Sequence, residues 1–296
     1  MINGNREQMG TIFNDLPLTR LKILMAGCLY RMIKPFVRKN HHTIKRRGIF
    51  YEIDLIEGID LSLFIFGAFQ QHITACRLFD LPREAIILDV GANAGAISLP
   101  LADLAKNGHV YAFEPVTAMY DKLLRNISLN PVLAGRVTPV KAFVSNQSRA
   151  TTNHRAVYGR WRVCNGRKDR HPIHGGEKED IAGTTQITLD DYCARINLTR
   201  VDLIKIDVEG HEFHVLQGAR RILAQQRPVI IFEAGLYSMQ EHGTAFPTCY
   251  DFLSGLGYRL IHSKNGRPIT RENYRVHIPR LSTIDIIAMP EAVHHQ

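Results

Sequence analysis

Residues 86–114 restrict the fold of this chain most: an apolar strand runs into a glycine-containing turn, a helix and a second strand. The second strand ends in Glu114, 19 residues beyond Gly95. This order forms half of a nucleotide-binding βαβ unit, in which an acid about 20 residues beyond the turn accepts hydrogen bonds from ribose hydroxyls. The spacing therefore predicts that Glu114 binds a ribose.

The turn at residues 91–95 indicates which nucleotide is bound. Its sequence, Gly-Ala-Asn-Ala-Gly, lacks the glycine pattern that brings backbone against a dinucleotide pyrophosphate. Asp89, just before the turn, would repel a diphosphate and would attract an ammonium group. S-adenosylmethionine carries an ammonium, a sulfonium and a ribose, so it is the cofactor we expect.

We expect each polar or glycine residue of this segment to meet a different part of the cofactor. Asp89 would bind the ammonium, directly or through water. Gly91 and Gly95 would let the backbone approach the ligand closely, and Asn93 would add a side-chain hydrogen bond. The alternative is a structural turn that caps a helix, which leaves the spacing of Glu114 unexplained.

Strands alternate with helices along the rest of the chain. The expected strands are 86–90, 109–113, 137–144, 201–207 and 228–233, and the expected helices are 95–106, 116–129, 188–197, 211–225 and 247–256. Such alternation requires parallel pairing through crossovers, which predicts an α/β, Rossmann-like, doubly wound sheet. Strands 258–262 and 284–288 are separated by a segment long enough for a return hairpin, so we expect an antiparallel last strand.

A second motif, Val201-Asp-Leu-Ile-Lys-Ile-Asp-Val-Glu-Gly-His-Glu, places acids where the fourth strand ends. Methyl transfer from a sulfonium is an in-line displacement that also needs a base for the acceptor proton. Asp207, Glu209 and His211 are the candidate catalytic residues, with Glu233 as a neighbour. His211 could equally be a surface or capping residue, and Glu209 could simply favour a helix N-terminus.

Four ordered motifs resemble those of the FkbM-type S-adenosylmethionine-dependent methyltransferases. They are DVGANAGAISLPLA from Asp89, VYAFEP at 110–115, LLRNISLNP at 123–131 and VDLIKIDVEGHEFHVLQGA at 201–219. The resemblance implies a class I methyltransferase fold and O-methylation of a sugar, glycolipid or secondary metabolite. It also implies that Ser145 and Asn146 contact the adenine amine, although a turn role is as good an explanation.

Two other functions remain open at this stage. One is a nicotinamide-dependent oxidoreductase or epimerase, which the missing glycine pattern disfavours. The other is a non-catalytic member that binds a membrane or partner, against which Asp89, Glu114 and Asp207 speak. Calorimetric titration with S-adenosylhomocysteine and, separately, with NAD distinguishes a methyltransferase from the nicotinamide-dependent enzyme.

We expect no metal in the site. Asp207 and Glu233 could hold magnesium at neighbouring strand ends, but only two ligands are visible. Cys164, His171 and His174 fall far below the specificity of a zinc motif.

The positive charge is concentrated in the first fifty residues, which carry +8 of the net +9. The rest is nearly neutral, so nucleic acid is an unlikely partner. Five cysteines without a C-x-x-C pair indicate a reducing compartment. No signal peptide and no run of about 18 apolar residues appears, so we expect a cytoplasmic protein.

We divide the chain into a basic arm, 1–48, and a methyltransferase domain, 49–296, which includes a cap at 49–84 and an insert at 147–187. Within the arm, apolar residues recur at helical spacing: Leu21, Leu24, Met25, Cys28, Leu29, Met32, Ile33 and Phe36. This face could contact an anionic membrane through residues 16–47, or pack on the domain or a second subunit. The insert is either functional or forms short strands of its own.

Overall fold

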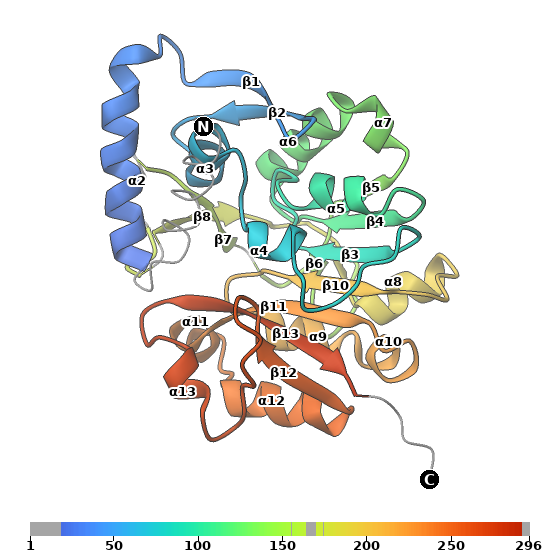
Figure 1. The fold of residues 1–296 in the computed structure, drawn as a ribbon. Helices are drawn as coiled ribbons and strands as arrows, with labels where there is room; N and C mark the ends of the chain where they lie inside the picture. Colours follow the sequence, from blue (N-terminus) through green and yellow to red (C-terminus); the bar gives the residue numbers. More distant parts are fainter. Residues whose placement is uncertain (1–18, 155, 164–169, 174, 292–296) are drawn as a thin grey trace.

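The computed structural model describes residues 19–154, 156–163, 170–173 and 175–291. A seven-stranded sheet forms its centre, in the order β12-β13-β11-β10-β3-β4-β5 (Figure 1). The strands are β3 (Ile86–Val90), β4 (His109–Phe113), β5 (Val137–Val140), β10 (Leu203–Ile206), β11 (Val229–Gly235), β12 (Tyr258–His262) and β13 (Thr283–Pro290). Neighbouring strands of this sheet are parallel except in the two pairs that β13 forms with β11 and β12, which are antiparallel. The doubly wound sheet with an antiparallel last strand is confirmed.

The two faces of the sheet are covered by different helices. One face packs against α8 (Leu189–Arg195), α9 (Glu212–Gln217), α10 (Arg220–Gln225) and α12 (Phe246–Gly255). The other packs against α3 (Gly58–Phe66), α5 (Ser98–Leu104), α6 (Thr117–Ser128) and α7 (Pro131–Ala134). Shorter helices are η1 (Lys34–Phe36), α4 (Gln71–Thr74), α11 (Leu236–Glu241) and α13 (Tyr274–His277).

Alternation along the central strands decides which side chains meet. Leu88 and Val90 of β3 belong to the core under α8 to α10, whereas Ile87 belongs to the core under α5 and α6. Because side chains alternate between faces, Asp89 shares the α5 face with Ile87. The same alternation in β10 places Lys205 on that face, and Asp89 and Lys205 are register partners. This pairing buries an acid and a base side by side.

Several element boundaries differ from those expected. The expected helix 95–106 begins only at Ser98, and the expected helix 211–225 is divided into α9 and α10. The division lies at Gly218, where a Cβ would overlap the carbonyl oxygen of Ser145. The expected strand 137–144 is divided into β5 and β6 (Phe143–Val144).

The cap before the sheet is more elaborate than expected. β1 (His41–Arg46) and β2 (Ile49–Asp54) form an antiparallel hairpin, so the expected boundary at residue 48 falls in its turn. Two short helices, α3 and α4, lie between β2 and β3. α3 occupies Gly58–Phe66 and ends at Gly67, whose φ of 79° is left-handed.

The insert forms short strands of its own, one of the two expectations for it. β7 (Ala156–Trp161) and β8 (Gly176–Asp180) pair antiparallel, and β9 (Gln186–Ile187) pairs with β6. Val163 donates its backbone N–H to the carbonyl of Ile56 at 2.8 Å, which ties the insert to the cap. Figure 1 shows β7 and β8 beside α3.

The helix expected in the arm is α2 (Thr19–Ile33). Its apolar face is divided between two environments. Ala26 and Tyr30 are buried, and Met25, Leu29 and Ile33 pack against the core beneath the cap. Leu24 and Met32 of α2, and Phe36 of the following helix η1, are 66%, 69% and 88% exposed. Packing on the domain therefore uses one edge of the face and leaves the other exposed.

No helix among the described residues is long and apolar enough to cross a membrane. Cys28, Cys76, Cys193 and Cys249 are free thiols, and Cys164 lies outside the described residues.

Candidate active site

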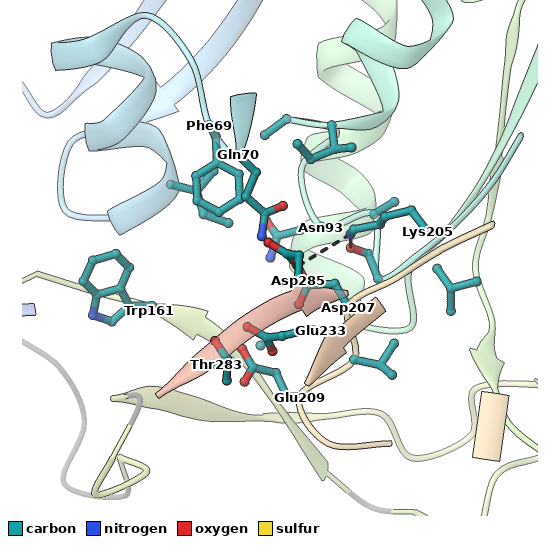
Figure 2. A pocket seen from close by; sticks show the side chains of 18 of the residues that line it. Phe69, Gln70, Asn93, Trp161, Lys205, Asp207, Glu209, Glu233, Thr283 and Asp285 are labelled. Carbon is teal, nitrogen blue, oxygen red and sulfur yellow. Dashed lines mark hydrogen bonds and ion pairs between the residues drawn. The ribbon is translucent and has the colours of Figure 1, made fainter. Parts of the chain in front are cut away.

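A cavity of about 580 Å³ lies at the carboxyl ends of β3, β4, β10 and β11. The cap, the insert and the segment before β13 contribute further walls. Glu114 ends β4, Asp207 follows β10, and Glu233 lies in β11, so parallel strand ends bring these three acids into one cavity. Figure 2 shows part of this cavity with Asn93, Lys205, Asp207, Glu209 and Glu233 around it.

Glu114 is 5% exposed and lines the cavity. Its Oε2 accepts the backbone N–H of Asn93 at 2.8 Å, and its Oε1 accepts that of Val116 at 2.9 Å. Burial raises the pKa of Glu114 to about 7, and the two N–H donors oppose this rise. Each oxygen retains a lone pair, so the carboxylate can accept two further hydrogen bonds from vicinal hydroxyls.

The glycines of the turn serve the packing of the protein chain. A Cβ on Gly91 would overlap the carbonyl oxygen of Asp207, so the turn after β3 touches the turn after β10. A Cβ on Gly95 would lie 2.7 Å from Leu123 of α6. Both glycines have φ values near 80° to 90°, in the left-handed region. Gly91 lines the cavity, and Gly95 is not among the lining residues that the structure describes.

Asp89 lies behind the cavity wall and is fully buried. Its Oδ2 accepts the Ser98 hydroxyl at 2.5 Å, and its Oδ1 lies 3.2 Å from Lys205 Nζ. Lys205 also donates to the carbonyl of Gly91 at 2.9 Å and lies 3.7 Å from Asp207 Oδ2. Burial opposes the charge of Lys205, but Asp89 and Asp207 raise its pKa overall. Asp89 therefore contacts Lys205 and Ser98, and it is not among the described residues that line the cavity.

The turn after β10 directs two carboxylates into the cavity. Asp207 is 23% exposed at its side chain; burial raises its pKa, and Lys205 opposes the rise. Glu209 adopts φ 55°, and burial together with the charges of Asp207 and Glu212 raises its pKa to about 8. Glu212 is buried and accepts the backbone N–H groups of Val208 and Gly210 at 3.1 and 3.0 Å. Glu212 thus holds the turn, and Glu209 faces the cavity.

His211, Ser145 and Asn146 are outside the set of described residues that line the cavity. His211 is 4% exposed, and its Nε2 lies 2.9 Å from the Ser145 hydroxyl. Burial, followed by the neighbouring histidines 214, 242 and 154, lowers the pKa of His211 to about 2. A histidine in this position is poorly suited to take a proton at the acceptor. Asn146 bonds Gln217 at 3.2 Å on the surface.

The apolar side of the cavity offers a different environment for an adenine. Val116, Met119 and Phe143 line it next to Glu114 and belong to one buried cluster. Lys122 of α6 and Asp60 of α3, which also line the cavity, form a buried ion pair that joins the cap to α6. Burial raises the pKa of Asp60 to about 6 despite this partner.

Four residues that line the cavity were not predicted as site residues from the sequence. Gln70 donates from Nε2 to Asp207 Oδ2 at 3.3 Å, and His72 lies 2.5 Å from Asp285 Oδ2. Burial alone would raise the pKa of Asp285, but His72 lowers it overall. Trp161 of the insert also lines the cavity. Of these four, only Asp285 lies within an expected strand, near the start of the apolar strand β13.

Two observations mark this cavity as functional. Gln70, Asn93 and Glu209 line it and have φ of 42°, 51° and 55°, a region that costs free energy for residues other than glycine. Glu233 and Asp285 are also direct register partners on antiparallel strands. Burial and the charges of Asp207, Glu209 and Glu212 raise the pKa of Glu233 well above its usual value, and such perturbed buried acids cluster at functional sites.

No group of three metal-ligating side chains among the described residues could hold a metal ion. His171 is buried and contacts Glu241 at 2.9 Å, while Cys164 and His174 lie outside the described residues.

The sheet order, the ribose-type carboxylate and the acid at the end of β10 are those of an S-adenosylmethionine-dependent methyltransferase. Residues 89–260 match the sequence profile of the methyltransferase FkbM domain, so the chain belongs to the FkbM methyltransferase family.

Three relatives with low sequence identity to this chain are methyltransferases. Methyltransferase sdnD from Sordaria araneosa is 26% identical over 56% of this chain and 75% of its own length. Hexuronic acid methyltransferase AglP from Haloferax volcanii is 25% identical over 55% of this chain and 61% of its own. The 2-O-methyltransferase NoeI from Sinorhizobium fredii is 24% identical over 54% of this chain and 68% of its own.

The cavity fits the cofactor of this family, S-adenosylmethionine. The buried Glu114 carboxylate would accept hydrogen bonds from its ribose, and Val116, Met119 and Phe143 would provide an apolar surface for its adenine. When bound, the cofactor supplies an electrophilic methyl group. The acids after β10 and in β11 then lie on the opposite side of Glu114 from the adenine surface, across β3.

Proposed function

We propose that the protein transfers the methyl group to a hydroxyl oxygen of a sugar, a glycolipid or a secondary metabolite. The observation that carries this proposal is the presence of Glu209 and Asp207 in the same cavity as Glu114. A hydroxyl acceptor must lose a proton during or after transfer, and a carboxylate within the cavity can receive it.

Glu209 fits the role of the base best. A general base works best when its pKa lies near the operating pH, and that of Glu209 is raised to about 8. Asp207 is engaged by Lys205 and Gln70, so its proposed work is electrostatic: to stabilise and orient charge beside the reacting atoms.

Trp161 and Gly58 support a ring-shaped acceptor. A Cβ on Gly58 would overlap the indole of Trp161, so the glycine allows the ring to lie against the start of α3. Both residues line the cavity. An aromatic face in a cavity with carboxylates suits the apolar face and the hydroxyls of a sugar ring. The hexuronic acid methyltransferase AglP is consistent with such an acceptor.

The proposed reaction is tested with S-adenosylmethionine carrying a deuterated methyl group and a panel of uronic acids, glycosides and glycolipids. Mass spectrometry locates the label. We expect an O-linked methyl group and loss of transfer in Glu209→Gln with S-adenosylhomocysteine binding retained. Label on nitrogen or carbon, or full turnover by Glu209→Gln, would refute the proposed chemistry.

The role of Trp161 is tested with Trp161→Ala and Gly58→Ala. Both should raise KM for the acceptor more than they change kcat, because each alters the proposed acceptor surface without touching the acids. Val132→Ala is a suitable control, since Val132 is exposed on α7, none of whose residues lines the cavity. Unchanged KM in both variants would remove Trp161 from the acceptor site.

We further propose that the exposed edge of α2 contacts an anionic membrane surface. Leu24 and Met32 of α2 and Phe36 of the following η1 are exposed, and Arg31, Lys34, Arg38 and Lys39 are exposed close by in the sequence. Basic side chains near an anionic bilayer contribute about 1 kcal/mol each and are screened by salt. Such attachment would bring the enzyme to a lipid-linked acceptor.

The membrane proposal is tested by co-sedimentation with vesicles containing phosphatidylserine. We expect binding at low salt, release at high salt, and loss of binding in the triple variant Leu24→Ser, Met32→Ser, Phe36→Ser. The control is the double variant Val132→Ser, Val276→Ser, because these valines are 75% and 86% exposed and lie outside α2. Point variants are preferable to truncation, since α2 and β1 pack on the domain. Equal binding of triple variant and control would refute the proposal.

A further inference from the structure

Gln70 is held in an unusual conformation at the edge of the cavity. It lies in the loop between α3 and α4 with φ 42° and ψ 50°, a left-handed conformation that favours glycine. No glycine stands here, although Gly67 three residues earlier does adopt φ 79°. The side chain therefore has a use that offsets the backbone strain.

The carboxamide of Gln70 is only half satisfied. Its Nε2 donates to Asp207 Oδ2 at 3.3 Å. Its Oε1 is buried, and within the described part of the chain it has no hydrogen-bond partner. Because Nε2 faces a carboxylate, which only accepts, the orientation of the amide is determined and Oε1 is the free end. Figure 2 shows Gln70 pointing into the cavity beside Asn93 and Asp285.

Gln70 lies at the end of the cavity where we expect the amino-acid part of the cofactor. With the adenine against Val116 and Phe143 and the ribose on Glu114 at the end of β4, the rest of the cofactor extends past β3 toward β10. Gln70 and Asp207 lie at that end. The amino-acid part of S-adenosylmethionine is therefore the part that reaches them.

The polar groups around Gln70 Oε1 favour a ligand group that is positively charged and donates hydrogen bonds. Asp207 and Asp285 are carboxylates; His72 is engaged by Asp285, and Lys205 by Asp89, Asp207 and the carbonyl of Gly91. An acceptor-rich, acidic corner matches an ammonium, which carries three donors and a positive charge. Asp89, whose sequence position suggested this role, is occupied by Lys205 and Ser98.

We propose that Gln70 binds the ammonium of the methionine part of S-adenosylmethionine through Oε1, while its Nε2 holds Asp207 in place. The inference deepens the cofactor assignment and does not depend on the identity of the acceptor. It also gives the cap a function, since α4 and the preceding loop close on the cofactor through this residue.

The test compares two probes by calorimetry. S-adenosylhomocysteine has the ammonium, and 5′-methylthioadenosine has the same nucleoside without the amino-acid part. In Gln70→Met, we expect about tenfold weaker binding of S-adenosylhomocysteine, as for loss of one hydrogen bond to a charged group, and 5′-methylthioadenosine affinity within about twofold of the wild type. Gln70→Glu keeps an acceptor oxygen and should restore most of the affinity.

Two controls separate binding from folding. Gln70→Gly removes the side chain while accepting the left-handed backbone, so its melting temperature should stay equal or rise while S-adenosylhomocysteine affinity falls. Gln71→Met changes the same residue type one position later, outside the described lining of the cavity, and should bind both probes normally.

Equal loss of both probes in Gln70→Met and Gln70→Gly would show a purely structural role and overturn the proposal. Unchanged S-adenosylhomocysteine affinity would show that Oε1 does not face the ammonium. A wild-type protein that binds neither probe would instead overturn the cofactor assignment, and the proposal with it.

Discussion

Replacing Glu114 by alanine should weaken cofactor binding by about two orders of magnitude. Its two oxygens each accept one backbone N–H and can each accept one ribose hydroxyl. A hydrogen bond to a charged group contributes roughly 1.5–3 kcal/mol, and water entering the vacated space recovers part of the loss. Taking the lower value for both bonds gives about 3 kcal/mol, or a Kd increase of about 150-fold for S-adenosylhomocysteine.

The assay is calorimetric titration of Glu114→Ala and Glu114→Gln, with Asp121→Ala as control because Asp121 is an exposed acid on α6. Glu114→Gln keeps one acceptor and should lose less. The 2′-deoxy analogue of S-adenosylhomocysteine completes a double-mutant cycle: its affinity should respond less to Glu114→Ala than that of the full ligand.

Binding should also depend on pH through Glu114. Ribose hydroxyls donate to the ionised carboxylate, whose pKa in the unbound protein is about 7. Affinity should therefore rise as the pH increases from 6 to 8, with proton release on binding at the acid end. A folded Glu114→Ala variant whose affinity differs less than about threefold from the wild type would refute the ribose assignment.

Three further outcomes follow from the buried charges and the close turn. The pKa of Glu209 is raised to about 8 in the folded protein, so the stability linked to its protonation is present below about pH 4.5 and is lost as the pH rises to 8. Glu209→Gln should therefore raise the free energy of unfolding at pH 8, on the order of 1–3 kcal/mol, and should leave it unchanged at pH 4.5. Chemical denaturation at both pH values measures this, and an equal effect at both would contradict it. Gly91→Ala should destabilise by about 2–4 kcal/mol in the same assay, because its Cβ would overlap the Asp207 carbonyl; a loss below about 0.5 kcal/mol would disprove that contact. Lys205→Met should cost about 3–5 kcal/mol by leaving Asp89 buried without its cation, and Lys205→Met with Asp89→Asn should recover much of it; no recovery would separate the two residues.

The sequence by itself determined the strand ends and therefore the acids that meet in the cavity. Parallel strands bring their carboxyl ends to one edge, so Glu114 after β4 and Asp207 after β10 reach the same edge, on either side of β3, in any chain that pairs in this order. The order of such segments along the chain also predicted the doubly wound sheet, its antiparallel last strand and the family, because each short segment shows its own pattern of apolar and polar residues.

Contacts between distant segments were decided only by the tertiary structure. Alternation in β3 and β10 buries Asp89 against Lys205, so a residue that precedes the turn lies behind the cavity wall. Gln70 reaches Asp207, 137 positions away, because the cap folds back over the sheet. A sequence reports the type of such a side chain but not the partner that the fold brings to it.

The arm and the histidine of the second motif show the same limit. Helical spacing predicted one apolar face on α2, yet the cap covers only the edge containing Met25 and Leu29, and Met32 and Phe36 stay exposed. His211 begins α9 beside two candidate acids, but its ring turns toward Ser145, where burial leaves it neutral. Periodicity determines which residues share a helix face, and only packing determines how much of that face is covered.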